Sequence, residues 1–76
     1  MLKELDRIVL LTDVVADGLK AGDVGTIVHV YADGNSFEVE FISLAGDTVA
    51  VANLPATQVR PVSKQDITHV RTLSVA

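Results

Sequence analysis

The stretch that most constrains the fold is residues 18–31, which read GLKAGDVGTIVHVY. Gly18, Gly22 and Gly25 follow one another at spacings of four and three residues, and they lead directly into a run rich in β-branched side chains. Glycine adopts backbone conformations that other residues avoid, and β-branched residues favour strands. The stretch therefore predicts a turn-rich loop that leads the chain into a strand over residues 24–31.

Further strand-like runs, separated by turn signals, occupy most of the remaining chain. Asp33 and Gly34 form the dipeptide that favours a hairpin turn. Alternation over residues 36–42 predicts a strand that buries one face and exposes the other. The predicted strands are residues 7–12, 24–31, 36–42, 48–52 and 59–62, with a long loop over 13–23, a turn at 45–47 and a short helical turn within 53–58.

The pattern also predicts which side chains reach the core. In the third strand the inward residues are Phe37, Val39 and Phe41, while Glu38 and Glu40 face water. In the fourth strand we expect Val49 and Val51 to point inward, and in the long loop we expect Val14, Val15 and Leu19 to fold over the core. An interior glycine marks a bulge or a close backbone approach, so Gly25 leaves open whether Ile27 or Val28 is buried.

Length and composition limit the ways in which this chain can be stabilised. A chain of 76 residues is one small domain, and without cysteine it has no disulfide. Its composition is 49% hydrophobic with few aromatics, which suits a sheet closed around small branched side chains. We predict an all-β fold, a small SH3-like barrel of about five strands over residues 1–62, followed by a C-terminal segment over residues 63–76.

The C-terminal segment differs from the barrel in composition. After the polar residues 64–66 it is β-prone, and its apolar side chains include Ile67, Val70 and Leu73. An exposed β-prone segment is a template for strand pairing. We expect it to fray, to add a strand to its own sheet or to pair with a neighbouring chain, and we favour pairing that produces a homo-oligomer.

Several runs together resemble a family of short bacterial proteins, common in cyanobacteria, that is described as a domain of unknown function. The runs are LKELDRIVL at residues 2–10, the stretch at residues 18–31, FEVEF at residues 37–41 and QVRPV at residues 58–62. The resemblance covers residues 2–62 and leaves out the C-terminal segment. It implies a small SH3-like barrel and no established activity.

A looser resemblance rests on the turn GDVGTIV at residues 22–28, which precedes a Val-x-Phe strand. This arrangement is similar to the small barrel subunit of photosystem I and to the barrel domain of nitrile hydratase β subunits. Both resemblances imply a docking module within a larger assembly and carry over no catalytic residue. The acidic charge of this chain departs from the photosystem subunit and argues against docking of an electron carrier.

The charge of the chain disfavours several classes of partner. The formal net charge is −4 and the sequence pI is about 4.8, which gives nucleic-acid phosphates and anionic lipids little to bind. No apolar run approaches the roughly 20 residues that cross a bilayer. The first seven residues mix both charge signs and do not read as a secretion signal, so we expect a cytoplasmic protein without membrane contact.

No motif in the sequence indicates catalysis or cofactor binding. His29 and His69 have no partners at ligand spacing, so we expect no metal site. The glycine-led loop does not read as a phosphate loop, because no lysine precedes Thr26 and a strand follows where a helix should begin. Glu38 and Glu40 are best explained as a solvated strand face. We therefore predict no catalytic residue, no cofactor and no enzymatic activity.

The most economical function is a protein-interaction or assembly module, with a nucleic-acid or ribosome-associated barrel as the alternative. The alternative is supported only by the glycine-led turn. We also expect Arg60 to pair with an acidic turn residue such as Asp23. The predicted structural turns are at Gly18, Gly22, Gly25 and Gly34, and the predicted interaction surface comprises Asp13, Asp17, Lys20, Ile67, Val70 and Leu73.

Overall fold

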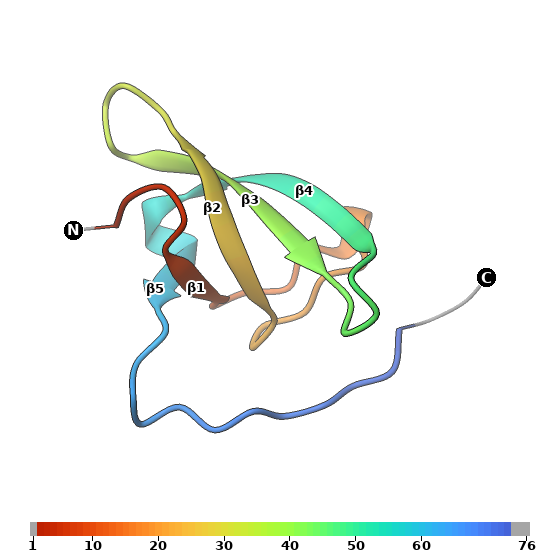
Figure 1. Ribbon diagram of the computed structural model, residues 1–76. Coiled ribbons are helices and arrows are strands. Elements are labelled where there is room, and N and C mark those ends of the chain that lie inside the picture. The colour runs from red at the N-terminus through yellow and green to blue at the C-terminus, as the bar shows by residue number, and fades with distance from the viewer. Residues whose placement is uncertain (1, 74–76) are drawn as a thin grey trace.

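The computed structural model describes residues 2–73, which form an all-β fold with one five-stranded antiparallel sheet (Figure 1). The sheet order is β4-β3-β2-β1-β5, the order of an SH3-like barrel, which confirms the predicted fold class. The elements are β1 (Arg7–Leu10), η1 (Val15–Asp17), β2 (Val24–Val30), β3 (Ser36–Ile42), β4 (Thr48–Pro55), η2 (Ala56–Gln58) and β5 (Val59–Pro61), where η1 and η2 are single 3₁₀ turns.

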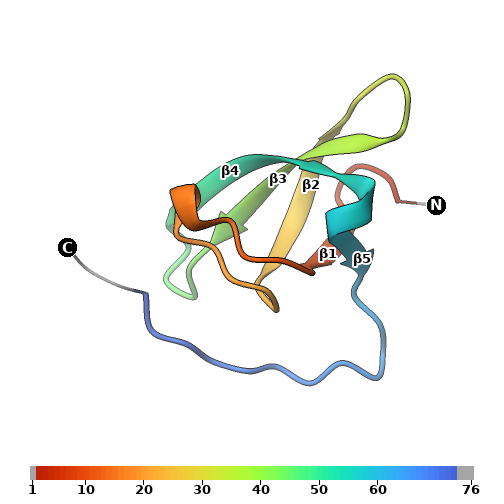
Figure 2. The same cartoon turned by 180° about the vertical axis from the view of Figure 1, so that it is seen from behind.

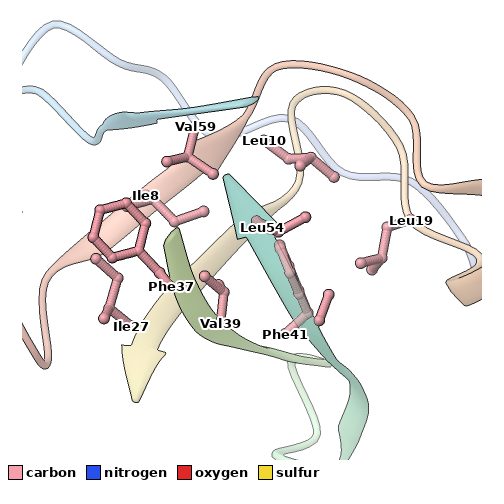
Figure 3. Packing of buried hydrophobic residues seen from close by; sticks show 10 residues of the cluster. Ile8, Leu10, Leu19, Ile27, Phe37, Val39, Phe41, Leu54 and Val59 are labelled. Carbon is pink, nitrogen blue, oxygen red and sulfur yellow. The ribbon is translucent and has the colours of Figure 1, made fainter. Parts of the chain in front are cut away.

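The sheet curls around a filled apolar core (Figure 3). Phe37, Val39 and Phe41 all point into it from β3, as their alternation with the two glutamates predicts. Burial of such side chains is the main favourable term in the folding of a small domain. The buried cluster comprises Ile8, Leu10, Leu19, Ile27, Phe37, Val39, Phe41, Ala52, Leu54 and Val59.

Gly25 lies where β2 and β3 approach each other closely. A Cβ atom at this position would lie 2.6 Å from Cγ1 of Val39, 2.9 Å from Cε2 of Phe41 and 3.0 Å from the carbonyl oxygen of Glu40. Of the two explanations for an interior glycine, close approach therefore applies at Gly25. Gly18, Gly22 and Gly34 instead have positive φ angles of 70°, 95° and 71°, and the structure adds Gly46 at 92°.

The burial pattern of β2 answers the question that the sequence left open at Ile27 and Val28, and a bulge follows Ile27. The register between β2 and β3 shifts between Ile27 and His29, so the intervening Val28 has no partner in the ladder. An extra residue of this kind reverses the side-chain phase of the strand beyond it. Ile27, before the bulge, keeps the inward phase of Gly25 and is fully buried, whereas Val28 is exposed and Val30, beyond the bulge, packs against the core.

A second bulge makes the prediction for Val51 in β4 wrong. Phe41 pairs with Ala50 and the next residue, Ile42, pairs with Thr48, so Val49 is the extra residue. The phase beyond it places Ala52 and Leu54 in the core, whereas the side chain predicted to be inward, Val51, is 52% exposed. Val49 itself is partly buried against the core.

Residues 11–23, called the first loop from here on, are attached to the core by two side chains, those of Leu19 and Val14. Leu19 is buried and Val14 packs against the core cluster, as predicted, and the two form an isolated β-bridge. Val15 begins η1 and is exposed, so the prediction that it covers the core is wrong. Gly18 ends η1 in the left-handed conformation.

Residues 63–73 of the C-terminal segment run past the barrel from the β5 side to the side where η1 lies, as both views show (Figures 1 and 2). Residues 63–73 contain a turn at Lys64 and Gln65 and no strand. The predicted extra strand in the protein's own sheet therefore does not form within these residues. Met1 and residues 74–76 of the predicted ranges lie outside the described residues. Within residues 2–73 no helix is long and apolar enough to cross a membrane.

Candidate functional site

Hydrogen bonds within the first loop fix its shape. The Asp13 carboxylate accepts a hydrogen bond from the backbone N–H of Ala21 at 2.8 Å, and the Asp23 carboxylate accepts one from the N–H of Lys20 at 2.8 Å. The N–H of Leu10 on β1 donates to the carbonyl oxygen of Asp23, also at 2.8 Å. Short polar side chains of this kind stabilise turns through local backbone contacts, so the loop is structured by its own residues.

The first loop holds one side chain from the C-terminal segment, that of Arg71. Its Nε and Nη2 donate hydrogen bonds to Oδ1 and Oδ2 of Asp23 at 2.8 and 2.6 Å, and Nη2 also donates to the carbonyl oxygen of Gly18 at 3.1 Å. The side chains of Arg71 and Asp23 are 27% and 17% exposed. This is the bidentate geometry for which a guanidinium is suited.

The charges at this contact reinforce one another. The hydrogen bond from Arg71 lowers the pKa of the Asp23 carboxyl, with further help from the N–H of Lys20, although partial burial opposes the shift. The hydrogen bond to Asp23 raises the pKa of the Arg71 guanidinium, and the charge of Asp13 adds to the effect. Both partners therefore keep their charges at neutral pH.

A second ion pair holds the beginning of the C-terminal segment. Arg60 on β5 donates from Nη1 and Nη2 to the two carboxylate oxygens of Asp66 at 3.0 and 2.8 Å. Asp66 also accepts a hydrogen bond from the N–H of Ser63 at 2.7 Å, which folds its carboxylate back toward β5. The prediction that Arg60 pairs with Asp23 is wrong, because this local turn supplies a nearer carboxylate and Asp23 is taken by Arg71.

Between the two ion pairs, residues 67–70 extend along the barrel with little contact to it, and we call them the suspended residues. Ile67 and Val70 are 90% and 74% exposed, and His69 is also exposed. Within the described residues, the backbone of residues 67–73 takes part in no backbone–backbone hydrogen bond. A β-prone segment therefore presents free donors and acceptors together with apolar side chains.

The structure brings together four of the six predicted interaction residues. Asp13, Asp17, Lys20 and Leu73 line one open depression of about 340 Å³, where Arg71 also lies. Ile67 and Val70 lie outside it, on the suspended part of the segment. We call these six residues, together with Asp23 and Arg71, the loop–segment surface. Sequence reasoning named Asp23 but with Arg60 as its partner, and it missed Arg71, whose sole signal was the excess of basic residues over Asp66 in the C-terminal segment.

The other residues considered for chemistry occupy ordinary surface positions. The rings of His29 and Tyr31 meet edge to face at a centroid distance of 4.8 Å. Partial desolvation, followed by the charge of Glu38, raises the pKa of Tyr31. Glu40 accepts a hydrogen bond from Oγ1 of Thr48 at 2.8 Å. Among residues 2–73 no three His, Asp or Glu side chains are grouped so that they could hold a metal ion.

The sheet order and the filled core define a small SH3-like barrel protein. Residues 4–61 match a protein family described as Domain of unknown function (DUF4926), and the chain belongs to this family. The matched range contains all five strands and ends before the C-terminal segment. No curated protein and no solved structure matches the chain.

Proposed function

We propose that the protein is a non-catalytic interaction module that binds another polypeptide through the loop–segment surface. The observation that carries the proposal is the engagement of the first loop with an extended segment of polypeptide, through a bidentate ion pair between Arg71 and Asp23. A surface that holds one such segment has the chemistry to hold another. The resemblance to barrels that dock within larger assemblies supports the same function.

The chemistry of the surface favours a protein partner over a nucleic acid. The loop–segment surface combines carboxylates with exposed apolar side chains, and the whole chain carries a net charge of −4. Phosphates would be repelled by Asp13, Asp17 and Asp23. Phe37 and Phe41 are buried, so neither offers a platform for base stacking.

The partner that we propose is a second copy of this chain, in a bacterial cytoplasm. The suspended residues between the two ion pairs present unpaired backbone groups, and such a segment can associate with another chain by strand addition. Burial of Ile67 and Val70 in that contact would remove two largely exposed apolar side chains from water. The absence of cysteine suits a reducing compartment.

The proposal is tested by the mass of the protein in solution. Sedimentation equilibrium of the full chain should give a mass above that of the monomer, while a chain that ends at Ser63 should be monomeric. A full-length variant with Ile67→Asp and Val70→Asp should also be monomeric. Leu44→Asp is the matched control, because Leu44 is 98% exposed on the β3–β4 turn and should not affect association. If the full chain is a monomer, self-association through this segment is wrong.

A further inference from the structure

We propose that Asp23 and the carbonyl oxygen of Gly18 form a guanidinium-binding site, which in the associated protein receives Arg71 from a second copy of the chain. This inference rests on the proposed function and specifies its contact. Two copies would exchange their C-terminal segments, so that each first loop holds the arginine of its partner.

The site matches a guanidinium and not a simple cation. Three hydrogen bonds reach it, two to the Asp23 carboxylate and one to the carbonyl oxygen of Gly18, and they come from two different nitrogens of Arg71. A lysine ammonium is a point donor and cannot reproduce this fork. With its side chain 17% exposed, Asp23 is held mostly away from water, which strengthens the pairing.

The site is formed by the first loop without help from the C-terminal segment. The N–H of Lys20 orients the Asp23 carboxylate, and the left-handed conformation of Gly18 at the end of η1 sets the direction of its carbonyl group. Leu19, buried between these elements, anchors the loop to the core. A preformed site of this kind binds an incoming arginine without a large ordering cost.

The exchange is favoured because few contacts other than the Arg71 ion pair hold residues 67–73 on their own barrel. Arg71 is separated from Asp23 by 48 residues along the chain, and the suspended residues 67–70 make no backbone hydrogen bond to the barrel. A second copy can supply the same contacts with identical geometry, which is why segment exchange is a low-cost route to dimers.

Because the pair between Arg60 and Asp66 keeps the start of the segment on its own barrel, residues 67–70 act as the hinge. The five Cα–Cα steps from Asp66 to Arg71 span at most about 18 Å, so the β5 side of one barrel must lie near the first loop of the other.

The first experiment measures binding at the site in solution. The acceptor is the full chain with Arg71→Ala, and the probe is a peptide of residues 64–76. We expect saturable binding with shifts of the Gly18 and Asp23 amide resonances. Binding should weaken about tenfold or more for a peptide with Arg71→Lys and for an acceptor protein that also carries Asp23→Asn. The asparagine keeps an oxygen that accepts the hydrogen bond from the N–H of Lys20.

Asp33→Asn, in the distant β2–β3 hairpin, is the matched control and should leave the affinity unchanged. Equal affinity for the arginine and lysine peptides, or no binding, would overturn the guanidinium site.

The second experiment tests whether the arginine comes from a second copy. Full-length Arg71→Ala retains the site but offers no arginine, and full-length Asp23→Asn offers the arginine but has a weakened site. Each alone should be monomeric, whereas their mixture should form a heterodimer through one intact contact. A mixture that stays monomeric would overturn the exchange, even where the peptide binds. If Arg71→Ala alone associates as strongly as the full natural chain, the proposed function stands and the exchange is wrong.

Discussion

At the scale of single residues, two positions on either side of the same loop–strand boundary have separate tasks. Gly25 allows β2 and β3 to pack closely, because its missing side chain leaves room for Val39 and Phe41. Asp23, two residues earlier, caps a turn and binds Arg71. One residue therefore serves the barrel and the other serves the loop–segment surface, so substitutions can separate stability from binding.

Gly25→Ala should destabilise the barrel. Its Cβ atom would overlap Val39 and meet the backbone carbonyl of Glu40 at 3.0 Å, which cannot move without disturbing the ladder. Overpacking of this kind costs about 1–3 kcal/mol in the free energy of unfolding, which urea denaturation measures. Gly46→Asn is the control, since asparagine tolerates the left-handed conformation and nothing lies within 4 Å of its Cβ position. A Gly25→Ala variant as stable as the natural chain would contradict this packing.

The sequence allowed only one of these two tasks to be predicted. An interior glycine in a strand is a local signal, and close approach was one of its two explanations. The ion pair between Asp23 and Arg71 has no local signal in the sequence. It depends on the path of the chain over the 10 residues from the end of β5 to Arg71. The prediction chose Arg60 as the partner of Asp23 and did not anticipate the turn that gives Arg60 its own carboxylate, that of Asp66.

At the scale of elements, the strands could be predicted from the sequence, and so could the side-chain phase of β3, but the phase of β4 could not. Turn signals and β-branched runs indicated all five strands, and the bounds of β3 were predicted without error. The side-chain phase failed in β4 because one extra residue, Val49, lies opposite the step between Phe41 and Ile42. Bulges depend on how two strands fit together, so the pattern of one strand does not reveal them.

The register of β4 can be tested with one pair of substitutions. Leu54→Ala removes a fully buried side chain and should lower the free energy of unfolding by about 2–5 kcal/mol. Val51→Ala, at the position that alternation predicted to be buried, should change it by about 0.5 kcal/mol or less, because Val51 is half exposed. Urea denaturation of both variants provides the measurement. A larger loss for Val51→Ala than for Leu54→Ala would contradict the bulge at Val49.

At the scale of the whole molecule, the barrel and the C-terminal segment are held by different forces. The core cluster extends from Ile8 to Val59 and is entirely apolar, whereas Arg60–Asp66 and Arg71–Asp23 attach the segment through charges. Ion pairs weaken with protonation of the carboxylate, and the more exposed pair Arg60–Asp66 weakens with added salt as well, while apolar burial does not depend on pH. Acid should therefore release the segment from the first loop before it affects the barrel.

The titration of Asp23 reports this release directly. The pKa of Asp23 is lowered from its ordinary value of 3.8 chiefly by Arg71, so the contact should be complete above about pH 4 and should fade as the pH falls through the lowered value. In Arg71→Ala the pKa of Asp23 should rise toward 3.8, although the N–H of Lys20 still lowers it. The carboxyl carbon resonance of Asp23, followed from pH 7 to acid in both proteins, provides the measurement.

Asp6 is the internal control, because its pKa is lowered mainly by the backbone N–H of Lys3 and should not respond to Arg71. Identical Asp23 titrations in the two proteins would mean that Arg71 does not occupy the site in solution, since a bidentate guanidinium cannot bind a carboxylate without stabilising its charged form.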